Sequence, residues 1–209
     1  MDVPAKLSMF AMAALLLAGC GDTHTDYSSR GYAYASRGEF DRAIASYDKA
    51  VEKDPWNVEA YANRGYVYYA KGEYDRAIAN YDRALEIDPA YTRVYVNRGD
   101  AYFVKAEYEQ AISDYTRALE LNPRLAQVYD ARGLARAAQG DFDRAISNFT
   151  VAIGIEPRNA RFYAHRAAAH RDKGLYEQAW QDVRQAQKLG HQVDPEFLKR
   201  LREDSDQVK

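Results

Sequence analysis

The stretch Tyr61-Ala-Asn-Arg-Gly65 returns 34 residues later as Tyr95-Val-Asn-Arg-Gly99. The same offset runs without insertion from about residue 24 to residue 193, which divides this part of the chain into five units of equal length. A fixed period in the range of about 20 to 50 residues predicts a stack of similar units, each burying its apolar face on its neighbours. Positions that keep this phase in all five units are an aromatic residue (40, 74, 108, 142, 176) and an alanine (43, 77, 111, 145, 179).

Each unit is predicted to form two helices. The first ends at a glycine at position 38, 72, 140 or 174, where a left-handed C-terminal cap is expected. In the third unit Ala106 stands at this place, so we expect a tighter or slightly strained turn. The second helix ends before Pro55, Pro89, Pro123 or Pro157, because proline disfavours helix at the residue before it. Its apolar stripe has helical spacing and comprises, in the first unit, Ala43, Ile44, Tyr47, Ala50 and Val51.

Small residues are predicted to bring the two helices of a unit close together. Gly65 and Ala77 allow the backbones to approach, and the aromatic side chain of Tyr81 fills the remaining space. The fifth unit departs from the pattern, since it carries Ala167 and Val183 at the corresponding places. Terminal repeats are often atypical because one of their faces has no neighbour. We expect residues 196–203 to form a helix that covers this unit with Phe197, Leu198 and Leu201, and residues 204–209 to be frayed.

The pattern resembles the tetratricopeptide repeat over about 170 of the 209 residues. The resemblance implies an all-α fold, a right-handed superhelical solenoid of five helix-turn-helix repeats plus a C-terminal capping helix. The repeats would span 24–57, 58–91, 92–125, 126–159 and 160–193, and the capping helix with its tail would span 194–209.

In this family the first helix of each repeat lines a concave groove that often takes a peptide. Asparagine amides can both donate to and accept from a peptide backbone, and aromatic rings supply contact area with little loss of entropy. In the alternative interpretation, Asn63 and Asn97 only bond to neighbouring helices. The resemblance places these candidate partner-binding residues in the groove: Tyr32, Asn63, Tyr66, Tyr69, Arg93, Asn97, Asp100, Phe103 and Leu134.

An arginine recurs in strict phase at positions 30, 64, 98, 132 and 166. The strict phase favours a structural role over a binding role. We expect the arginine stem to pack between helices while its head pairs with an acidic residue of the adjoining turn.

The N-terminus carries an apolar run, Leu7 to Ala18, that is too short to span a membrane as a helix. It ends in Leu17-Ala18-Gly19-Cys20, which resembles the bacterial lipobox. The resemblance implies a signal peptide over residues 1–19, acyl chains on Cys20, and a short tether over residues 20–23. Several acyl chains would anchor the protein stably in the cell envelope, with the outer membrane facing the periplasm as the expected site. The alternative is a buried cysteine at the end of a short apolar helix.

Composition argues against several other classes of protein. The chain carries 29 Lys and Arg against 31 Asp and Glu, which disfavours nucleic acid as the main ligand. A single cysteine cannot build a zinc cluster, and neither an H-x-x-x-H spacing nor a glycine-rich phosphate loop is present. We therefore expect no catalytic residues, no cofactor and no metal.

The function expected from these features is a membrane-anchored, non-catalytic scaffold that binds a protein or peptide in its groove. The combination resembles bacterial lipoproteins that assist secretins, outer-membrane protein assembly or peptidoglycan enzymes, and the sequence does not choose among them. Two alternatives stay open. One is a self-assembling structural lipoprotein that dimerises through exposed Tyr27 and Tyr34 of the first repeat. The other is a cytoplasmic module similar to a co-chaperone.

Overall fold

The computed structural model describes residues 23–207, and within that range the regular secondary structure is entirely helical. The predicted signal peptide, residues 1–19, and the predicted lipidation site, Cys20, lie outside the described residues. The helices are α2 (His24–Ala35), α3 (Phe40–Lys53), α4 (Val58–Ala70), α5 (Tyr74–Ile87), α6 (Thr92–Val104), α7 (Tyr108–Leu121), α8 (Ala126–Ala138), α9 (Phe142–Ile155), α10 (Ala160–Asp172), α11 (Tyr176–Lys188) and α12 (Pro195–Asp206).

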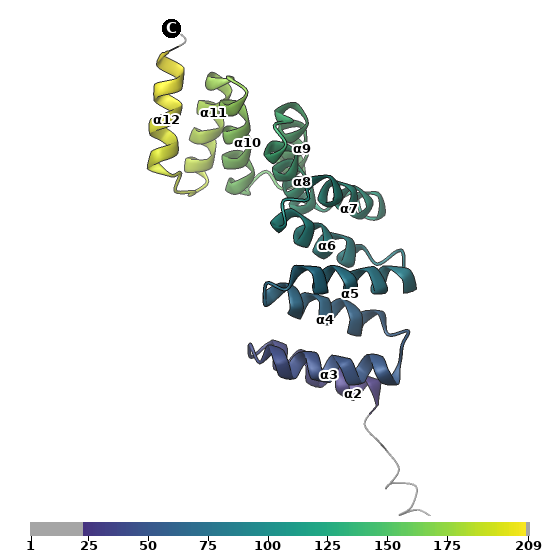
Figure 1. Ribbon diagram of the computed structural model, residues 1–209. Helices are drawn as coiled ribbons and strands as arrows, with labels where there is room; N and C mark the ends of the chain where they lie inside the picture. The colour runs from purple at the N-terminus through teal and green to yellow at the C-terminus, as the bar shows by residue number, and fades with distance from the viewer. Residues whose placement is uncertain (1–22, 208–209) are drawn as a thin grey trace, which may run out of the picture.

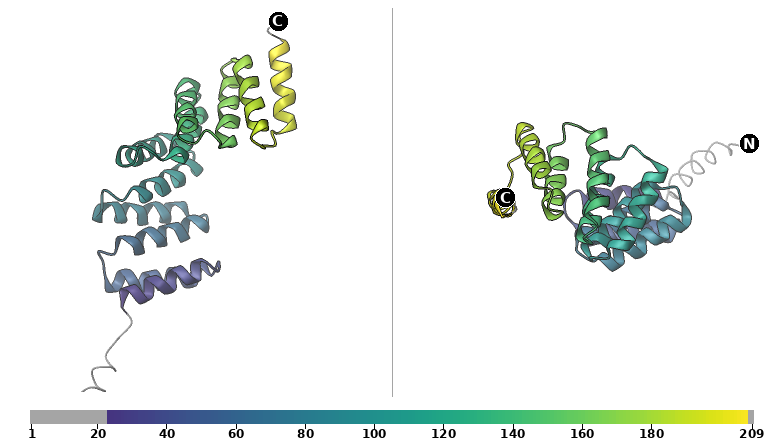
Figure 2. Two further views of the ribbon diagram at one scale, coloured as in Figure 1. Left: turned by 180° about the vertical axis from the view of Figure 1, so that it is seen from behind. Right: turned by 90° about the horizontal axis from the view of Figure 1, so that it is seen from above.

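The helices are arranged as five successive pairs, α2 with α3 through α10 with α11, followed by α12 (Figure 1). Each pair packs on the next along one direction, so that α2 and α12 lie at opposite ends of an elongated stack (Figures 1 and 2). The view along the stack shows that it turns as it extends (Figure 2). The predicted fold class, an all-α solenoid of helical repeats, is confirmed.

The turn inside each repeat uses a left-handed residue, as predicted. Gly72 has a φ of 78°, and its N–H donates to the carbonyl of Tyr69 over 2.9 Å. In the third repeat Ala106 adopts the same conformation with a φ of 60°, and its N–H donates to the carbonyl of Phe103 over 2.9 Å. The turn at Ala106 therefore has the same backbone conformation as the turns that contain glycine. Instead, a residue with a Cβ is held in a region that L-amino acids avoid, which confirms the expected strain.

The core of each of the first four repeats contains a close contact between a glycine and an aromatic ring. A Cβ added at Gly65 would lie 2.6 Å from Cε1 of Tyr81, and Tyr81 is only 1% exposed. Gly31, Gly99 and Gly133 meet the equivalent rings in the same way. The fifth repeat changes both partners together, since buried Ala167 faces a cluster that contains buried Val183. The larger side chain on α10 is thus matched by a smaller one on α11.

Helix α12 closes the stack, as expected, but it is longer than the sequence indicated. It begins at Pro195, and the side chain of Asp194 accepts a hydrogen bond from the N–H of Glu196 as its N-cap. It continues to Asp206, so the expectation that residues 204–206 are frayed is wrong. Leu201, in the middle of α12, is fully buried and packs with the core of the fifth repeat.

The first helices of successive repeats contact one another directly, α2 with α4, α4 with α6, α6 with α8, and α8 with α10. Within residues 23–207 the second helices make no comparable contact with each other. The first helices therefore lie on the inner side of the curved stack, which is where a concave binding surface is expected.

Candidate functional site

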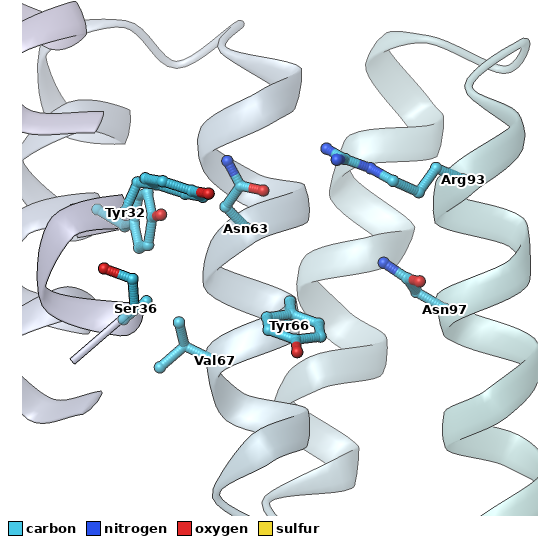
Figure 3. Close-up of a pocket in the computed structure, with 9 residues that line it drawn as sticks. Tyr32, Ser36, Asn63, Tyr66, Val67, Arg93 and Asn97 are labelled. Atoms are coloured by element: carbon cyan, nitrogen blue, oxygen red, sulfur yellow. The ribbon is translucent and has the colours of Figure 1, made fainter. Parts of the chain in front are cut away.

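A cavity of about 400 Å³ opens on the inner side between α2, α4 and α6. Each of the three helices presents side chains to it (Figure 3). It therefore crosses the junctions between the first, second and third repeats. The residues that line it are Tyr32, Ala35, Ser36, Tyr47, Asn63, Tyr66, Val67, Arg93 and Asn97.

Two aromatic side chains on the wall of this cavity are open to solvent. Tyr32 is 68% exposed and Tyr66 is 56% exposed, although both are large rings that would pack well in a core. A third ring, that of Tyr47, is buried. Burial raises the pKa of Tyr47 to about 12, and Tyr32 contributes less to this shift. The phenol of Tyr47 thus stays neutral at physiological pH. The exposed rings of Tyr32 and Tyr66 offer solvent-accessible apolar surface to a ligand.

The polar side chains of the cavity are Asn63, Arg93 and Asn97. Across residues 23–207 the amide groups of Asn63 and Asn97 form no hydrogen bond with another protein group. The alternative in which they only bond neighbouring helices therefore gains no support. Arg93 is exposed, and its Nη2 donates to the hydroxyl of Tyr91 over 2.9 Å. Both amides keep their donors and acceptors available, as recognition of a peptide backbone requires.

A second, smaller hollow of about 40 Å³ adjoins the first and shares Tyr66 and Asn97 with it. Tyr69 and Asp100 lie on its wall. The carboxylate of Asp100 accepts a hydrogen bond from the hydroxyl of Tyr115 over 2.7 Å. Burial raises the pKa of Asp100, and the hydrogen bond from Tyr115 only partly opposes this shift. Asp100 thus adds a half-buried acidic group to a groove that is otherwise aromatic, amide and basic.

The structure brings seven of the nine predicted groove residues together in the two hollows. The other two, Phe103 and Leu134, are half-buried and line neither hollow. Phe103 contacts the ring of Tyr108, with centroids 5.6 Å apart, and Leu134 packs on the cluster that contains Phe149. Sequence reasoning did not select Ala35, Tyr47 and Val67 as lining residues. Val67 follows Asn63 by one helical turn, and this spacing alone could have identified it.

The recurring arginines link successive repeats. Arg98 donates from Nε and Nη2 to Asp114 over 2.8 and 2.7 Å, and from Nη1 to Asp82 over 2.6 Å. One partner lies 16 residues later and the other 16 residues earlier, and Arg64, Arg132 and Arg166 repeat this spacing. The structural role is confirmed. The expected partner in the adjoining turn is wrong, since both partners lie on second helices.

Features expected at the first repeat are only partly present. Tyr27 and Tyr34 were expected to be exposed, but both are half-buried and pack on the core of the first repeat. The apolar surface on which dimerisation was to rest is therefore smaller than the sequence suggested. Among the described residues no helix is long and apolar enough to cross a membrane, and no group of His, Cys, Asp and Glu is placed to hold a metal ion.

Comparison with protein families gives matches along most of the repeat region. A family described as "TPR repeat" matches residues 31–72 and 65–105. Two families described as "Tetratricopeptide repeat" match residues 92–125 and 125–192. The matched segments join without a gap from residue 31 to residue 192. A comparison with curated proteins gives no match.

Solved structures share the fold over most of the chain. A structure described as "Crystal structure of MamA protein" has 31% sequence identity and a TM-score of 0.76, and the match covers 81% of this chain and 92% of that chain. MamA from Desulfovibrio magneticus RS-1 has 18% identity and a TM-score of 0.78, covering 81% and 96%. YrrB, described as "a TPR protein with an unusual peptide-binding site", has 24% identity and a TM-score of 0.71, covering 89% and 93%. The similarity to these last two structures, at 18% and 24% identity, shows a common fold and nothing more specific.

Proposed function

The chain belongs to the tetratricopeptide repeat family, and on that premise we propose that it is a non-catalytic scaffold that binds an extended peptide or protein segment in its inner groove. The observation that carries the proposal is the cavity between α2, α4 and α6, with its two solvent-exposed tyrosine rings and two unbonded amides. In residues 23–207 the rings are largely exposed and the amides form no hydrogen bond with another protein group, which favours a role in binding a ligand over a role in holding the repeat array together.

The chemistry of the cavity suits a peptide. The amides of Asn63 and Asn97 lie one repeat apart, on α4 and α6, and each can bond to both the N–H and the C=O of a ligand backbone. Tyr32 and Tyr66 would flank an apolar side chain of the ligand and remove it from water. The same fold in YrrB is described with a peptide-binding site, so the architecture accommodates such a ligand.

We further propose that the scaffold is tethered to a membrane of the cell envelope through acyl chains on Cys20, the outer membrane being the expected one. This part of the proposal rests on the sequence alone. Helix α2 begins at His24, only four residues after Cys20, and a tether of that length reaches at most about 15 Å. The first repeat and the cavity beside it would then lie near the membrane surface.

The binding proposal is tested by crosslinking in cells followed by capture of the membrane-bound protein. The variant Asn63→Ala/Tyr66→Ala/Asn97→Ala removes the ligand-facing groups, and Val151→Ala/Ile155→Ala, which trims two exposed residues of α9, is the matched control. We expect wild type and control to yield one common partner that the triple variant loses. Equal capture by all three proteins would refute the groove as the binding site.

The tether is tested separately, so that failure of one part leaves the other standing. Mass spectrometry of the membrane fraction should find an acylated N-terminal Cys20, and Cys20→Ser should move the protein into the soluble fraction. A membrane-bound Cys20→Ser variant, or an unmodified cysteine, would contradict the tether.

A further inference from the structure

A further cavity, of about 310 Å³, is rich in arginine and shares no lining residue with the two hollows of the inner groove. It is formed by one residue of α7, two of α8 and three of α9. It therefore belongs to the junction of the third and fourth repeats and not to the cavity between α2, α4 and α6. Its lining residues are Thr116, Arg132, Arg136, Arg144, Ser147 and Asn148.

Arg64, Arg98 and Arg166 each pair with at least one aspartate, whereas Arg132 pairs with neutral groups. Its Nε donates to the side-chain oxygen of Asn148 over 2.8 Å, and its Nη1 donates to the hydroxyl of Thr116 over 3.0 Å. Within the described range its Nη2 has no protein acceptor. In the third repeat, by contrast, Arg98 has a carboxylate at both places, Asp114 and Asp82.

The difference in partners changes the electrostatics of these two arginines. Burial lowers the pKa of Arg132. Tyr129 partly opposes this shift, and the positive charge of Arg136 adds to it. Burial alone would also lower the pKa of Arg98, but the hydrogen bonds and charges of Asp114 and Asp82 raise it instead. The half-buried Arg132 guanidinium thus lacks the negative charge that its counterpart has within the protein.

The fourth repeat adds positive charge at the same place. Position 136 is arginine, whereas the earlier repeats carry tyrosine there at 34, 68 and 102. Asp141 is the carboxylate paired with the other two arginines, at 3.7 Å from Arg136 and 3.1 Å from Arg144. Three guanidinium groups against one carboxylate leave two positive charges without a counterion among these residues.

We propose that this cavity is a binding site for a dianionic oxyanion of the phosphate class, either free phosphate or the phosphate of a lipid headgroup. The planar guanidinium groups can each present two N–H donors to such an anion, and the hydroxyl of Ser147 adds another donor. The bound anion completes at Arg132 the pairing that Asp114 provides to Arg98 within the chain.

Isothermal titration of the purified full-length protein with inorganic phosphate, against sodium chloride of equal ionic strength, tests the site. Asn148→Asp restores the internal carboxylate of the third repeat, and Arg136→Tyr restores the residue of the earlier repeats, so both are expected to fold. We expect saturable binding by wild type and at least tenfold weaker binding by both variants. Arg76→Gln, at the place of Arg144 in the second repeat, is the control and should bind as wild type does.

A second arm separates the sources of the anion. Vesicles of phosphatidylcholine with phosphatidic acid are compared with phosphatidylcholine alone, for wild type and both variants. Binding of phosphate, of phosphatidic acid vesicles, or of both supports the site when Asn148→Asp and Arg136→Tyr abolish it. The proposal is overturned if the wild type binds neither phosphate nor the phosphatidic acid vesicles. It is also overturned if both variants bind as the wild type does.

Discussion

Gly65 on α4 and Tyr81 on α5 touch so closely that a Cβ at position 65 would lie 2.6 Å from Cε1 and 2.8 Å from Cδ1 of the ring. The carbonyl oxygen of Ala77 would lie 3.2 Å from the same Cβ, so the added methyl group has no space. This contact sets the distance between the two helices of a repeat, and it recurs in the first four repeats.

Gly65→Ala is therefore expected to destabilise the protein by about 1–3 kcal/mol through overpacking, in spite of the better helix propensity of alanine. Gly154→Ala is the matched control, because it lies inside α9 and a Cβ there meets no atom within 4 Å. The control should be neutral or more stable by up to about 1 kcal/mol. Chemical denaturation followed by circular dichroism measures both, and equal effects would contradict the contact.

The fifth repeat suggests how this contact can be relaxed. Because Ala167 is combined there with Val183, Tyr81→Val should tolerate Gly65→Ala better than the wild type does. A double-mutant cycle is expected to give a double variant more stable than the sum of the two single losses predicts. If the two losses in free energy of unfolding simply add, the Ala167 and Val183 pair of the fifth repeat does not explain how the contact can be relaxed in the second repeat.

Ala106→Gly should stabilise the protein by about 1 kcal/mol, because glycine adopts a φ of 60° without the steric penalty that alanine bears. Gly72→Ala is the reciprocal change in the second repeat, where φ is 78° and no neighbour obstructs a Cβ, and it should destabilise by a similar amount. Thermal unfolding of the two variants checks the pair. A lower melting temperature for Ala106→Gly would show that the turn is not strained.

Asp100→Asn should raise stability at neutral pH. Since burial raises the pKa of Asp100, the folded protein keeps this proton to higher pH than the unfolded chain does. Stability is then lost as pH rises from the unfolded pKa through the folded pKa, and asparagine, which does not ionise, avoids that loss while still accepting the hydrogen bond from Tyr115. Denaturation at about pH 3 and at pH 7 tests this. A gain that is the same at both pH values would argue against the shift.

The arginine series gives a differential prediction. Arg98→Met leaves Asp114, which is 5% exposed, as a buried carboxylate without its cation, and should cost about 3–5 kcal/mol. Arg132→Met leaves only Asn148 and Thr116, so its loss should be smaller by about 2 kcal/mol or more. Adding Asp114→Asn to Arg98→Met should recover part of the stability. Equal losses for the two arginines would contradict the described pairing.

The sequence was sufficient for the repeat architecture because that architecture depends on period. The spacing of Gly65, Ala77 and Tyr81 already implied a close helix pair, and Gly72 implied a left-handed turn. At Ala106 the sequence indicated only a tighter or slightly strained turn, and the structure shows the same left-handed conformation there.

The 34-residue period does not determine whether a side chain of the first helix lies in the groove or packs against the second helix of its repeat. Tyr69 and Phe103 occupy equivalent positions and each contacts the next aromatic residue, Tyr74 or Tyr108, yet only Tyr69 lines a hollow.

The arginine-rich cavity was also beyond reach from the sequence. It depends on which residues stand 16 positions before and after Arg132, and these distant partners became evident only from the contacts with Thr116 and Asn148. The sequence favoured a partner in the nearby turn because local pairing is the simpler expectation. Once the geometry is known, comparing positions 116 and 148 with 82 and 114 exposes the missing carboxylates.

Occupation of the cavity between α2, α4 and α6 by a peptide can be measured in cells with a photo-crosslinking amino acid at position 66. Val151, which is 40% exposed on α9, is the control position. We expect one discrete adduct from position 66 that is lost in the Asn63→Ala/Asn97→Ala variant, and mass spectrometry would identify the crosslinked peptide. An adduct formed equally from position 151, or one that survives the loss of both amides, would contradict binding of a peptide in this cavity.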